Sequence, residues 1–234
     1  MKPVVVLQNE PEAPAGYLGD ALDRRGVPWT VVHMAAGDVP PAIDEVSAVV
    51  SLGGAMGAYE EAAFPFLAAQ KRYLAACTEA GIPVLGICLG CQLLADALGG
   101  RTYRAEEAEV VLAASDATPA GAADPVVAAL DGKRLIRFHQ DTFDVPPGTE
   151  VLAYGGGFPQ AFRVGASLGI QPHPEVTPAI FADWVGEGSG RDVALRSGAD
   201  PDALVDEFVA AEPEVAETAA AVFDAWIDEI VGAR

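Results

Sequence analysis

The chain has 234 residues, of which 51% are apolar and 21% are charged, as is typical of a well-packed globular protein. Its 14 basic and 34 acidic residues give a formal net charge of −20. Nucleic acids and anionic membranes attract basic surfaces, so we exclude both as expected partners. No apolar run approaches the roughly 20 residues that span a bilayer. The first residues lack a signal-peptide layout and the three cysteines make no disulfide framework, so we expect a cytoplasmic protein.

The first hundred residues alternate between strand-like and helix-like patterns. Short, continuously apolar runs are typical of strands that are covered on both faces. Helical spacing of apolar residues separates these runs. The predicted strands are 4–7, 29–33, 48–52 and 84–87, and the predicted helices lie around 17–22, 66–77 and 89–98. This alternation predicts an α/β fold with a flavodoxin-like, doubly wound parallel sheet and helices on both faces.

The pattern changes from about Arg101, where short candidate strands follow one another with turns between them. These strands are 109–112, 134–138, 150–153, 160–163 and 167–170, and they predict an antiparallel extension of the parallel core. Residues 113–124 are rich in Ala, Thr, Gly and Pro and are predicted to form a surface loop, and 155–157 a hairpin turn. An apolar stripe over 222–231 predicts the last helix. We expect residues 1–234 to form a single domain.

Cys88 lies at the corner between a predicted strand and a predicted helix. Gly86 and Gly90 flank it, so the segment has the G-x-nucleophile-x-G arrangement of a nucleophile elbow with cysteine as the nucleophile. We expect the glycines to permit a tight turn that exposes the thiol at the carboxyl edge of the sheet. The helix N-terminus beyond it favours the thiolate, which is the attacking form.

A cysteine nucleophile needs a base, and His173 is the best placed of the three histidines. It follows the predicted strand 167–170, and two prolines hold its segment extended. Residues two apart then point the same way, so Glu175 can orient the imidazole. For an oxyanion, the first donor would be the Leu89 N–H, with a second from the pair Gly53-Gly54.

Several segments together resemble the class I (triad-type) glutamine amidotransferase family, in the family's order. They are 85–92 (LGICLGCQ), 173–175 (HPE) and 51–54 (SLGG). Residues 138–143 (FHQDTF) and 159–162 (PQAF) are similar to the free-standing, GMP-synthase-like branch. The resemblance covers most of the chain.

The resemblance implies a glutaminase reaction, and we expect no cofactor. Cys88 would attack the γ-amide carbon of glutamine, and His173, oriented by Glu175, would protonate the nitrogen that departs as ammonia and then activate water. Gly54 and Leu89 would form the oxyanion hole. Gln92, which matches the Gln at the end of the family's elbow motif, would help to hold the substrate. We also predict Met56, His139 and Gln140 as substrate-binding residues.

The chain also departs from the family pattern near these residues. Pro172 stands where the family usually has an aromatic residue, and Gln140 where it has glycine. Ala55 replaces a common proline, and 107–110 (EAEV) is a reduced form of a Glu-Ile-Gly-Trp-like segment. Most of these departures lie where the family cradles its substrate, so they leave open which substrate would acylate Cys88.

Other interpretations of single residues stay open at this point. Cys88 and Cys91 form a C-x-x-C pair, which is compatible with redox chemistry, although Cys91 also fits a small buried helical residue. Cys77 fits a core helix face. His139 either shapes the substrate pocket or satisfies a local hydrogen bond. The histidines and cysteines lack zinc-ligand spacing, so we expect no metal site.

Three functions follow as alternatives. The first is a glutaminase subunit that delivers ammonia to a synthase on a separate polypeptide. The second is a stand-alone hydrolase or peptidase that acts on another γ-glutamyl compound. The third is a non-catalytic binding protein on the same fold. The protein partners compatible with them are a synthase subunit and a second copy of this chain.

Overall fold

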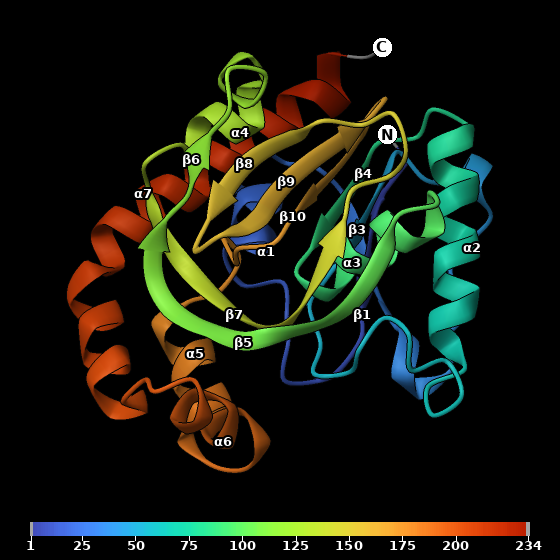
Figure 1. Ribbon diagram of the computed structural model, residues 1–234. Helices are drawn as coiled ribbons and strands as arrows, with labels where there is room; N and C mark the ends of the chain where they lie inside the picture. Colours follow the sequence, from blue (N-terminus) through green and yellow to red (C-terminus); the bar gives the residue numbers. More distant parts are fainter. Residues whose placement is uncertain (1, 233–234) are drawn as a thin grey trace.

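A computed structural model describes residues 2–232 and has an eight-stranded sheet at its centre (Figure 1). The strand order is β2-β1-β3-β4-β10-β9-β8-β6. Strands β2, β1, β3, β4 and β10 are parallel, and β9, β8 and β6 continue the sheet in antiparallel fashion. The parallel part has the 2-1-3-4-5 order of flavodoxin-like sheets. The predicted fold class and its antiparallel extension are therefore confirmed.

The bounds of these strands agree closely with the predicted ones in the first half of the chain. In chain order the strands of the large sheet are β1 (Val4–Gln8), β2 (Trp29–His33), β3 (Ala48–Ser51), β4 (Val84–Ile87), β6 (Asp116–Ala117), β8 (Val151–Gly155), β9 (Phe158–Val164) and β10 (Ser167–Ile170). The turn between β8 and β9 contains Gly156 and Gly157, both with positive φ, so the predicted hairpin at 155–157 is confirmed.

Two hydrophobic clusters cover the two faces of the sheet. In β1, Val4 and Val6 pack into one cluster, and Val5 and Leu7 pack into the other, because successive side chains of a strand point to opposite faces. The first cluster includes side chains of α1 (Gly16–Arg24), α4 (Pro125–Leu130), α5 (Pro178–Gly186), α6 (Ser189–Arg196) and α7 (Pro201–Gly232). The second includes α2 (Phe66–Glu79) and α3 (Leu89–Ala97), and Figure 1 shows α2 and α7 on opposite sides of the molecule.

Two predicted strands belong to a different sheet, which corrects the sequence-based prediction. β5 (Arg101–Ala114) and β7 (Arg134–Asp144) pair with each other as a long, curved antiparallel ribbon (Figure 1). The predicted strand 109–112 is only part of β5, because the pairing register shifts between Arg104 and Glu109. That irregularity interrupts the apolar alternation by which a strand is recognised.

The predicted loop at 113–124 is partly wrong. It contains the end of β5, the short strand β6 and a 3₁₀ helix at Gly121–Ala123. Strand β6 is too short to show a periodicity. It forms because β8 lies beside it, and the Asp131 carboxylate accepts a hydrogen bond from the Ala117 N–H at 2.8 Å.

The helical C-terminal part is also larger than predicted. Helix α7 begins at Pro201, and its buried stripe continues upstream of 222–231 through Leu204, Phe208 and Val215. The prediction also omitted α5 and α6, although Thr177 caps α5 and Pro178 occupies its first turn. The remaining 3₁₀ helices are Met34–Ala36 and Ile43–Glu45.

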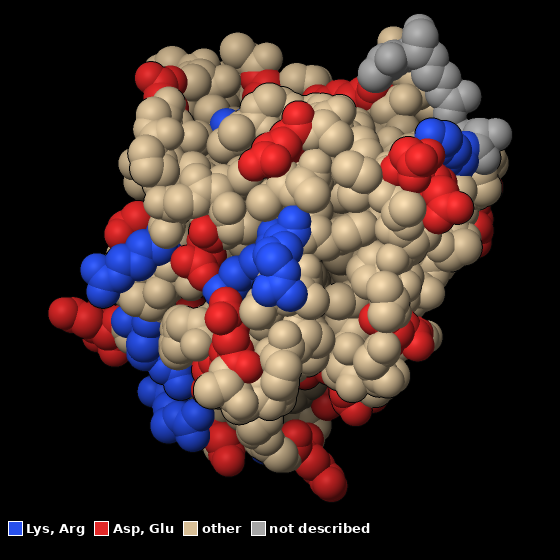
Figure 2. Space-filling model, turned by 90° about the vertical axis from the view of Figure 1, so that its right-hand side faces the viewer, with Lys and Arg blue, Asp and Glu red and all other residues tan. Residues whose placement is uncertain are grey.

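The surface of the described chain is mixed in charge on the face that carries α2. Acidic and basic side chains lie interspersed there (Figure 2), and Lys71 of α2, for instance, pairs with Glu61 at 2.7 Å and with Asp96. Within residues 2–232, none of the helices has the length and apolar character needed to cross a membrane.

Candidate active site

Cys88 occupies a strained corner between β4, which ends at Ile87, and α3, which begins at Leu89. Its φ is 51°, and among the described residues it is the only non-glycine residue with positive φ. Such a conformation costs about 1–3 kcal/mol and persists only where the surroundings enforce it. The Cys88 N–H donates to the Ile170 carbonyl of β10 at 2.9 Å, which ties the corner to the neighbouring strand. The predicted elbow is therefore confirmed as a geometry.

The two flanking glycines are required by close packing, which corrects their predicted role as turn residues. A Cβ on Gly86 would lie 2.5 Å from the Gly90 carbonyl oxygen. A Cβ on Gly90 would lie 1.9 Å from the Ser51 carbonyl oxygen of β3. Neither glycine has positive φ, and Cys88 itself absorbs the turn. The glycines therefore let α3 approach the ends of β3 and β4.

His173 and Glu175 form a buried pair just beyond β10. Nδ1 of His173 lies 2.8 Å from Oε1 of Glu175, and each residue is 2% exposed. The His173 N–H donates to the Ile136 carbonyl of β7 at 2.8 Å, and the Tyr17 N–H of α1 donates to the Glu175 carbonyl at 2.9 Å. The prediction that both side chains lie on one side is confirmed, and two neighbouring elements hold their backbone.

The pKa of His173 reflects a competition between burial and negative charge. Burial lowers this pKa, but the Glu175 carboxylate and then the charge of Cys88 raise it, and the result is about 10. Nε2 of His173 is buried and has no hydrogen-bond partner in the described part of the chain. This nitrogen is therefore available to exchange a proton with a group in front of it.

The loop that follows β3 brings the elbow and the histidine together. A Cβ on Gly53 would lie 3.2 Å from Cε1 of His173 and 3.8 Å from Cβ of Cys88, so both residues pack against this glycine. The next residue, Gly54, is close to Leu89, because its Cβ would lie 2.9 Å from Cδ2 of that residue. Neither the Gly54 N–H nor the Leu89 N–H donates a hydrogen bond to any residue between 2 and 232.

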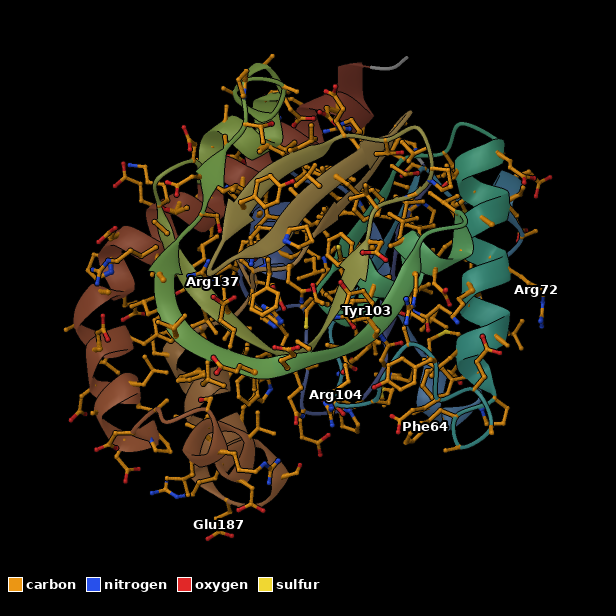
Figure 3. All side chains as sticks on the ribbon, in the orientation of Figure 1. Phe64, Arg72, Tyr103, Arg104, Arg137 and Glu187 are labelled. Carbon is orange, nitrogen blue, oxygen red and sulfur yellow. The ribbon has the colours of Figure 1, made fainter. Side chains whose placement is uncertain are left out.

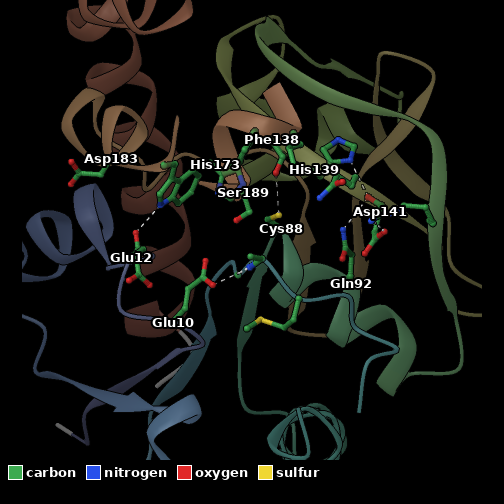
Figure 4. A pocket seen from close by; sticks show the side chains of 18 of the residues that line it. Glu10, Glu12, Cys88, Gln92, Phe138, His139, Asp141, His173, Asp183 and Ser189 are labelled. Atoms are coloured by element: carbon green, nitrogen blue, oxygen red, sulfur yellow. Dashed lines mark hydrogen bonds and ion pairs between the residues drawn. The ribbon is translucent and has the colours of Figure 1, made fainter. Parts of the chain in front are cut away.

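A cavity of about 310 Å³ opens in front of Cys88 (Figure 4). This volume is at the lower end of the range for small-molecule sites, so it suits a ligand of about amino-acid size. Of the predicted site residues, Leu89 and Glu175 support the site from outside the cavity lining. The others line it, namely Gly54, Met56, Cys88, Gln92, His139, Gln140 and His173.

Gln92 and His139 lie on the wall of the cavity, and both are held by protein partners. Nε2 of Gln92 donates to the Asp141 carbonyl and to Oε1 of Gln171, each at 3.1 Å. Nδ1 of His139 lies 3.0 Å from the same carbonyl of Asp141, and Nε2 lies 2.9 Å from Oε2 of Glu109. His139 therefore satisfies local hydrogen bonds, as one of the two interpretations expected, and it also lines the cavity, whereas its contact with a substrate stays a prediction.

Glu109 also binds Arg137, whose side chain points inward from the arch of β5 and β7 (Figure 3). Nη2 of Arg137 lies 3.3 Å from Oε1 of Glu109, and the Arg137 side chain is 5% exposed. Burial lowers the pKa of Arg137, whereas the charge of Glu109 raises it. This buried cluster fixes the position of His139 from behind.

Sequence patterns did not identify Trp184, a central residue of the cavity wall. Its ring lies edge-on to His173 with centroids 5.0 Å apart, and it stacks on Phe138 at 5.9 Å. Its indole Nε1–H donates to the Glu12 carbonyl at 2.7 Å. The available signal was Thr177-Pro178, which is typical of a helix start and would have predicted α5 directly after Glu175.

Acidic residues at the start of the chain also line the cavity and were not predicted. Glu10 follows β1, and its carboxylate accepts a hydrogen bond from the Ala55 N–H at 3.2 Å. Burial raises the pKa of Glu10, the Ala55 hydrogen bond opposes this shift, and the charge of Glu12 adds to it. Arg104, which lies 3.3 Å from Asp141, is the single Lys or Arg among the lining residues.

Cys91 is fully buried in α3, and burial together with the charge of Cys88 raises its pKa. Burial likewise raises the pKa of Cys77 to about 11. Since reactive thiols need an accessible thiolate, these two residues behave as core residues. Cys88, with its sulfur 3.8 Å from the Phe138 carbonyl oxygen, is the cysteine that faces the cavity.

Comparison with known proteins places the chain in a family. A family profile described as glutamine amidotransferase class-I matches residues 18–183. The chain is 30% identical over 180 residues to a putative glutamine amidotransferase-like protein of Salmonella typhimurium, with 74% of each chain covered. It is 43% identical over 101 residues to the GMP synthase of Thermomicrobium roseum, which covers 42% of this chain. The match spans only 19% of the length of that synthase.

Solved structures agree with the sequence comparisons. A glutamine amidotransferase from Thermotoga maritima is similar with a TM-score of 0.85 and 25% identity, and the match covers 98% of this chain and 97% of the other. A glutamine amidotransferase from Methylobacillus flagellatus has the same fold, with a TM-score of 0.87 at 24% identity over 97% of this chain and 95% of the other. The chain belongs to the class I glutamine amidotransferase family.

Proposed function

We propose that this protein hydrolyses the γ-amide of glutamine through a thioester on Cys88 and releases ammonia. One observation carries the proposal. His173 is hydrogen-bonded at Nδ1 to the buried Glu175, whereas its Nε2 is buried without a partner in the described chain, and both His173 and Cys88 pack against Gly53. This is the arrangement of a nucleophile, a base and an orienting carboxylate.

In the acylation half, the Cys88 thiolate attacks the γ-carbonyl carbon, and a bond forms between sulfur and carbon. Negative charge moves onto the carbonyl oxygen, where the unpaired N–H groups of Gly54 and Leu89 would stabilise it. The imidazolium of His173 then gives its Nε2 proton to the amide nitrogen. The carbon–nitrogen bond breaks, ammonia departs, and a γ-glutamyl thioester remains on Cys88.

In the deacylation half, water takes the place of ammonia. The neutral His173 accepts a proton from water as the oxygen attacks the thioester carbon, and the carbon–sulfur bond breaks to release glutamate and the Cys88 thiolate. The buried Glu175 favours the imidazolium in both halves, in agreement with the raised pKa of His173. Glu175 also fixes the ring so that Nε2 carries the transferred proton.

The cavity wall would hold the amino-acid end of the substrate. The Gln92 amide group is anchored by Asp141 and Gln171 and lines the cavity together with Met56, His139 and Gln140. We further propose that the released ammonia passes to a separate synthase. The relatives that match part of this chain include GMP synthases described as glutamine-hydrolysing. Their description supports a synthase as the acceptor of the ammonia.

A glutaminase assay combined with covalent labelling tests the proposal. We expect ammonia and glutamate in equal amounts from glutamine, and an electrophilic glutamine analogue should add one equivalent to Cys88 by mass spectrometry. Cys88→Ala should abolish both signals, whereas Cys91→Ala, three residues away in the core, should keep the label. Absence of both the adduct and hydrolysis in the wild-type protein would overturn the proposal.

The acidic cavity lining favours a second candidate, hydrolysis of a larger γ-glutamyl amide by the chain alone. Glu10, Glu12 and Asp183 line the cavity, and no Lys or Arg of the described residues forms a salt bridge with them. Ammonia needs no such surroundings, whereas an amine with a further positive charge would be attracted to them. Faster turnover of γ-glutamyl-1,4-diaminobutane than of glutamine would favour this candidate. Faster turnover of glutamine, further stimulated by a synthase, would favour the first.

A further inference from the structure

Asn9 connects the end of β1 to the glycine loop after β3. Its side chain is completely buried, and Nδ2 donates to the Leu52 carbonyl at 2.8 Å and to the Gly53 carbonyl at 3.3 Å. The two strands are parallel neighbours, with Leu7 opposite Ser51, so both continue into the cavity at the same edge of the sheet. The amide of Asn9 therefore contacts the loop whose next residue, Gly54, lines the cavity.

The direction of one peptide carbonyl determines the direction of the adjoining N–H. In a trans peptide the C=O and N–H groups point in opposite directions, and no cis peptide occurs among the described residues. Because the Gly53 carbonyl points toward Asn9, the Gly54 N–H of the same peptide points away from Asn9. Gly54 is wedged between two residues, since its Cβ would lie 3.2 Å from Cβ of Asn9 and 2.9 Å from Cδ2 of Leu89.

We propose that Asn9 is a positioning residue that holds the Gly53–Gly54 peptide with its N–H toward the Cys88 side of the cavity. The inference rests on the proposed acyl-transfer function, in which this N–H stabilises the oxyanion. With the peptide turned over, the Gly53 carbonyl oxygen would occupy the place where negative charge develops, and the Asn9 amide would lose an acceptor. Either consequence is unfavourable, because the carbonyl oxygen would repel the developing negative charge and a buried N–H donor would be left without a partner.

A second contact restrains the loop on its other side. The Ala55 N–H donates to the Glu10 carboxylate at 3.2 Å, so the residues that follow β1 hold the loop both before and after Gly54. Glycine at 53 and 54 leaves room for His173 and Leu89, but it also leaves these peptides free to rotate. The side chain of Asn9 supplies the restraint that the glycines lack.

The test removes the donor of Asn9 while keeping the size of its side chain. In Asn9→Leu and Asn9→Asp, we expect kcat to fall about 100-fold, which is the effect of losing one oxyanion donor. We expect KM to stay within about threefold, because ground-state binding is retained. Alkylation of Cys88 by iodoacetamide should keep its wild-type rate, since this displacement forms no oxyanion.

Gln70→Leu is the matched control. Gln70 is also fully buried, and its amide donates to the hydroxyl of Ser51, the last residue of β3, at 2.8 Å, but within the described chain it donates no hydrogen bond to Gly53 or Gly54. We expect this variant to lose stability and to keep kcat. The inference is overturned if the Asn9 variants keep wild-type kcat, or if kcat and the alkylation rate fall together, as general loosening of the site would cause.

The crystal structure of Asn9→Leu provides a readout that does not depend on activity. We expect the Gly53 carbonyl to have turned toward the cavity, and an unchanged peptide would overturn the inference. If the wild-type protein hydrolyses neither glutamine nor γ-glutamyl amides, the proposed function fails. The orientation of the Gly53–Gly54 peptide in Asn9→Leu still decides whether Asn9 positions that peptide.

Discussion

The side chain of Glu175 lies 2.8 Å from that of His173, and the protein surrounds this pair so closely that each residue is only 2% exposed. Water therefore screens their attraction poorly, and the carboxylate holds a proton on the imidazole. The pKa of His173 is consequently about 10, above its ordinary value of 6.5, even though burial by itself lowers it. This contact links the stability of the fold to the chemistry of the site.

Replacing Glu175 by Gln should change how stability depends on pH. A histidine whose pKa is raised by folding adds stability that is complete below pH 6.5 and is lost as pH rises through about 10. We expect the free energy of unfolding of the wild-type protein to decrease from about pH 6.5 upward, by at most about 1.4 kcal/mol per pH unit from this group. In Glu175→Gln this decrease should be smaller. Urea unfolding of both proteins at about pH 6, 8 and 9.5 measures this decrease. If the unfolding free energy falls equally with pH in the two proteins, the expectation is contradicted.

The strained corner at Cys88 predicts an unusual order of stability between two variants. Ala normally stabilises a position relative to Gly, because Gly loses more conformational freedom on folding. At φ 51° the order should reverse, so Cys88→Gly should be more stable than Cys88→Ala by about 1 kcal/mol. Both variants lack the thiol, so chemical denaturation compares the backbone alone. An Ala variant that is the more stable would show that the corner is not strained.

Trp184 should matter for activity more than for folding. The variant Trp184→Phe keeps an aromatic edge against His173 but loses the hydrogen bond to the Glu12 carbonyl, whereas Trp184→Ala removes the wall. We expect kcat/KM for glutamine to fall by less than about tenfold in Trp184→Phe. In Trp184→Ala we expect a loss of about 100-fold, because a misplaced catalytic base is costly. Steady-state kinetics test this order, and equal losses in the two variants would refute the role of the ring.

The cluster behind His139 should behave as a coupled unit. Glu109→Leu leaves Arg137 buried without its counter-ion, and we expect it to lose about 3–5 kcal/mol of unfolding free energy. The double variant Glu109→Leu/Arg137→Leu should be more stable than Glu109→Leu, because the unpaired charge is gone. A double-mutant cycle by urea denaturation measures the coupling energy. Strictly additive effects would mean that Arg137 does not depend on Glu109.

Several parts of the site were predictable because they rest on local patterns. The apolar runs and glycines around Cys88 predicted a strand, a corner and a helix, and the extended segment at 173–175 predicted that His173 and Glu175 share a side. Both were confirmed, since each depends on residues within a few positions of one another. The steric reason for Gly86 and Gly90 was not predictable, because it comes from the Ser51 and Gly90 carbonyls that pack against them.

By itself, the sequence determined the parallel α/β core and the local geometry around Cys88, His173 and Glu175, because periodicity and turn chemistry are local properties. The tertiary structure decided what surrounds them. Asn9 contacts Leu52, which is 43 positions away in the chain, and Trp184 contacts Glu12, which is 172 positions away, so no local pattern indicates either contact. Strands β5 and β7 likewise became a separate ribbon, because pairing between distant segments, rather than strand propensity, decides which sheet a strand joins.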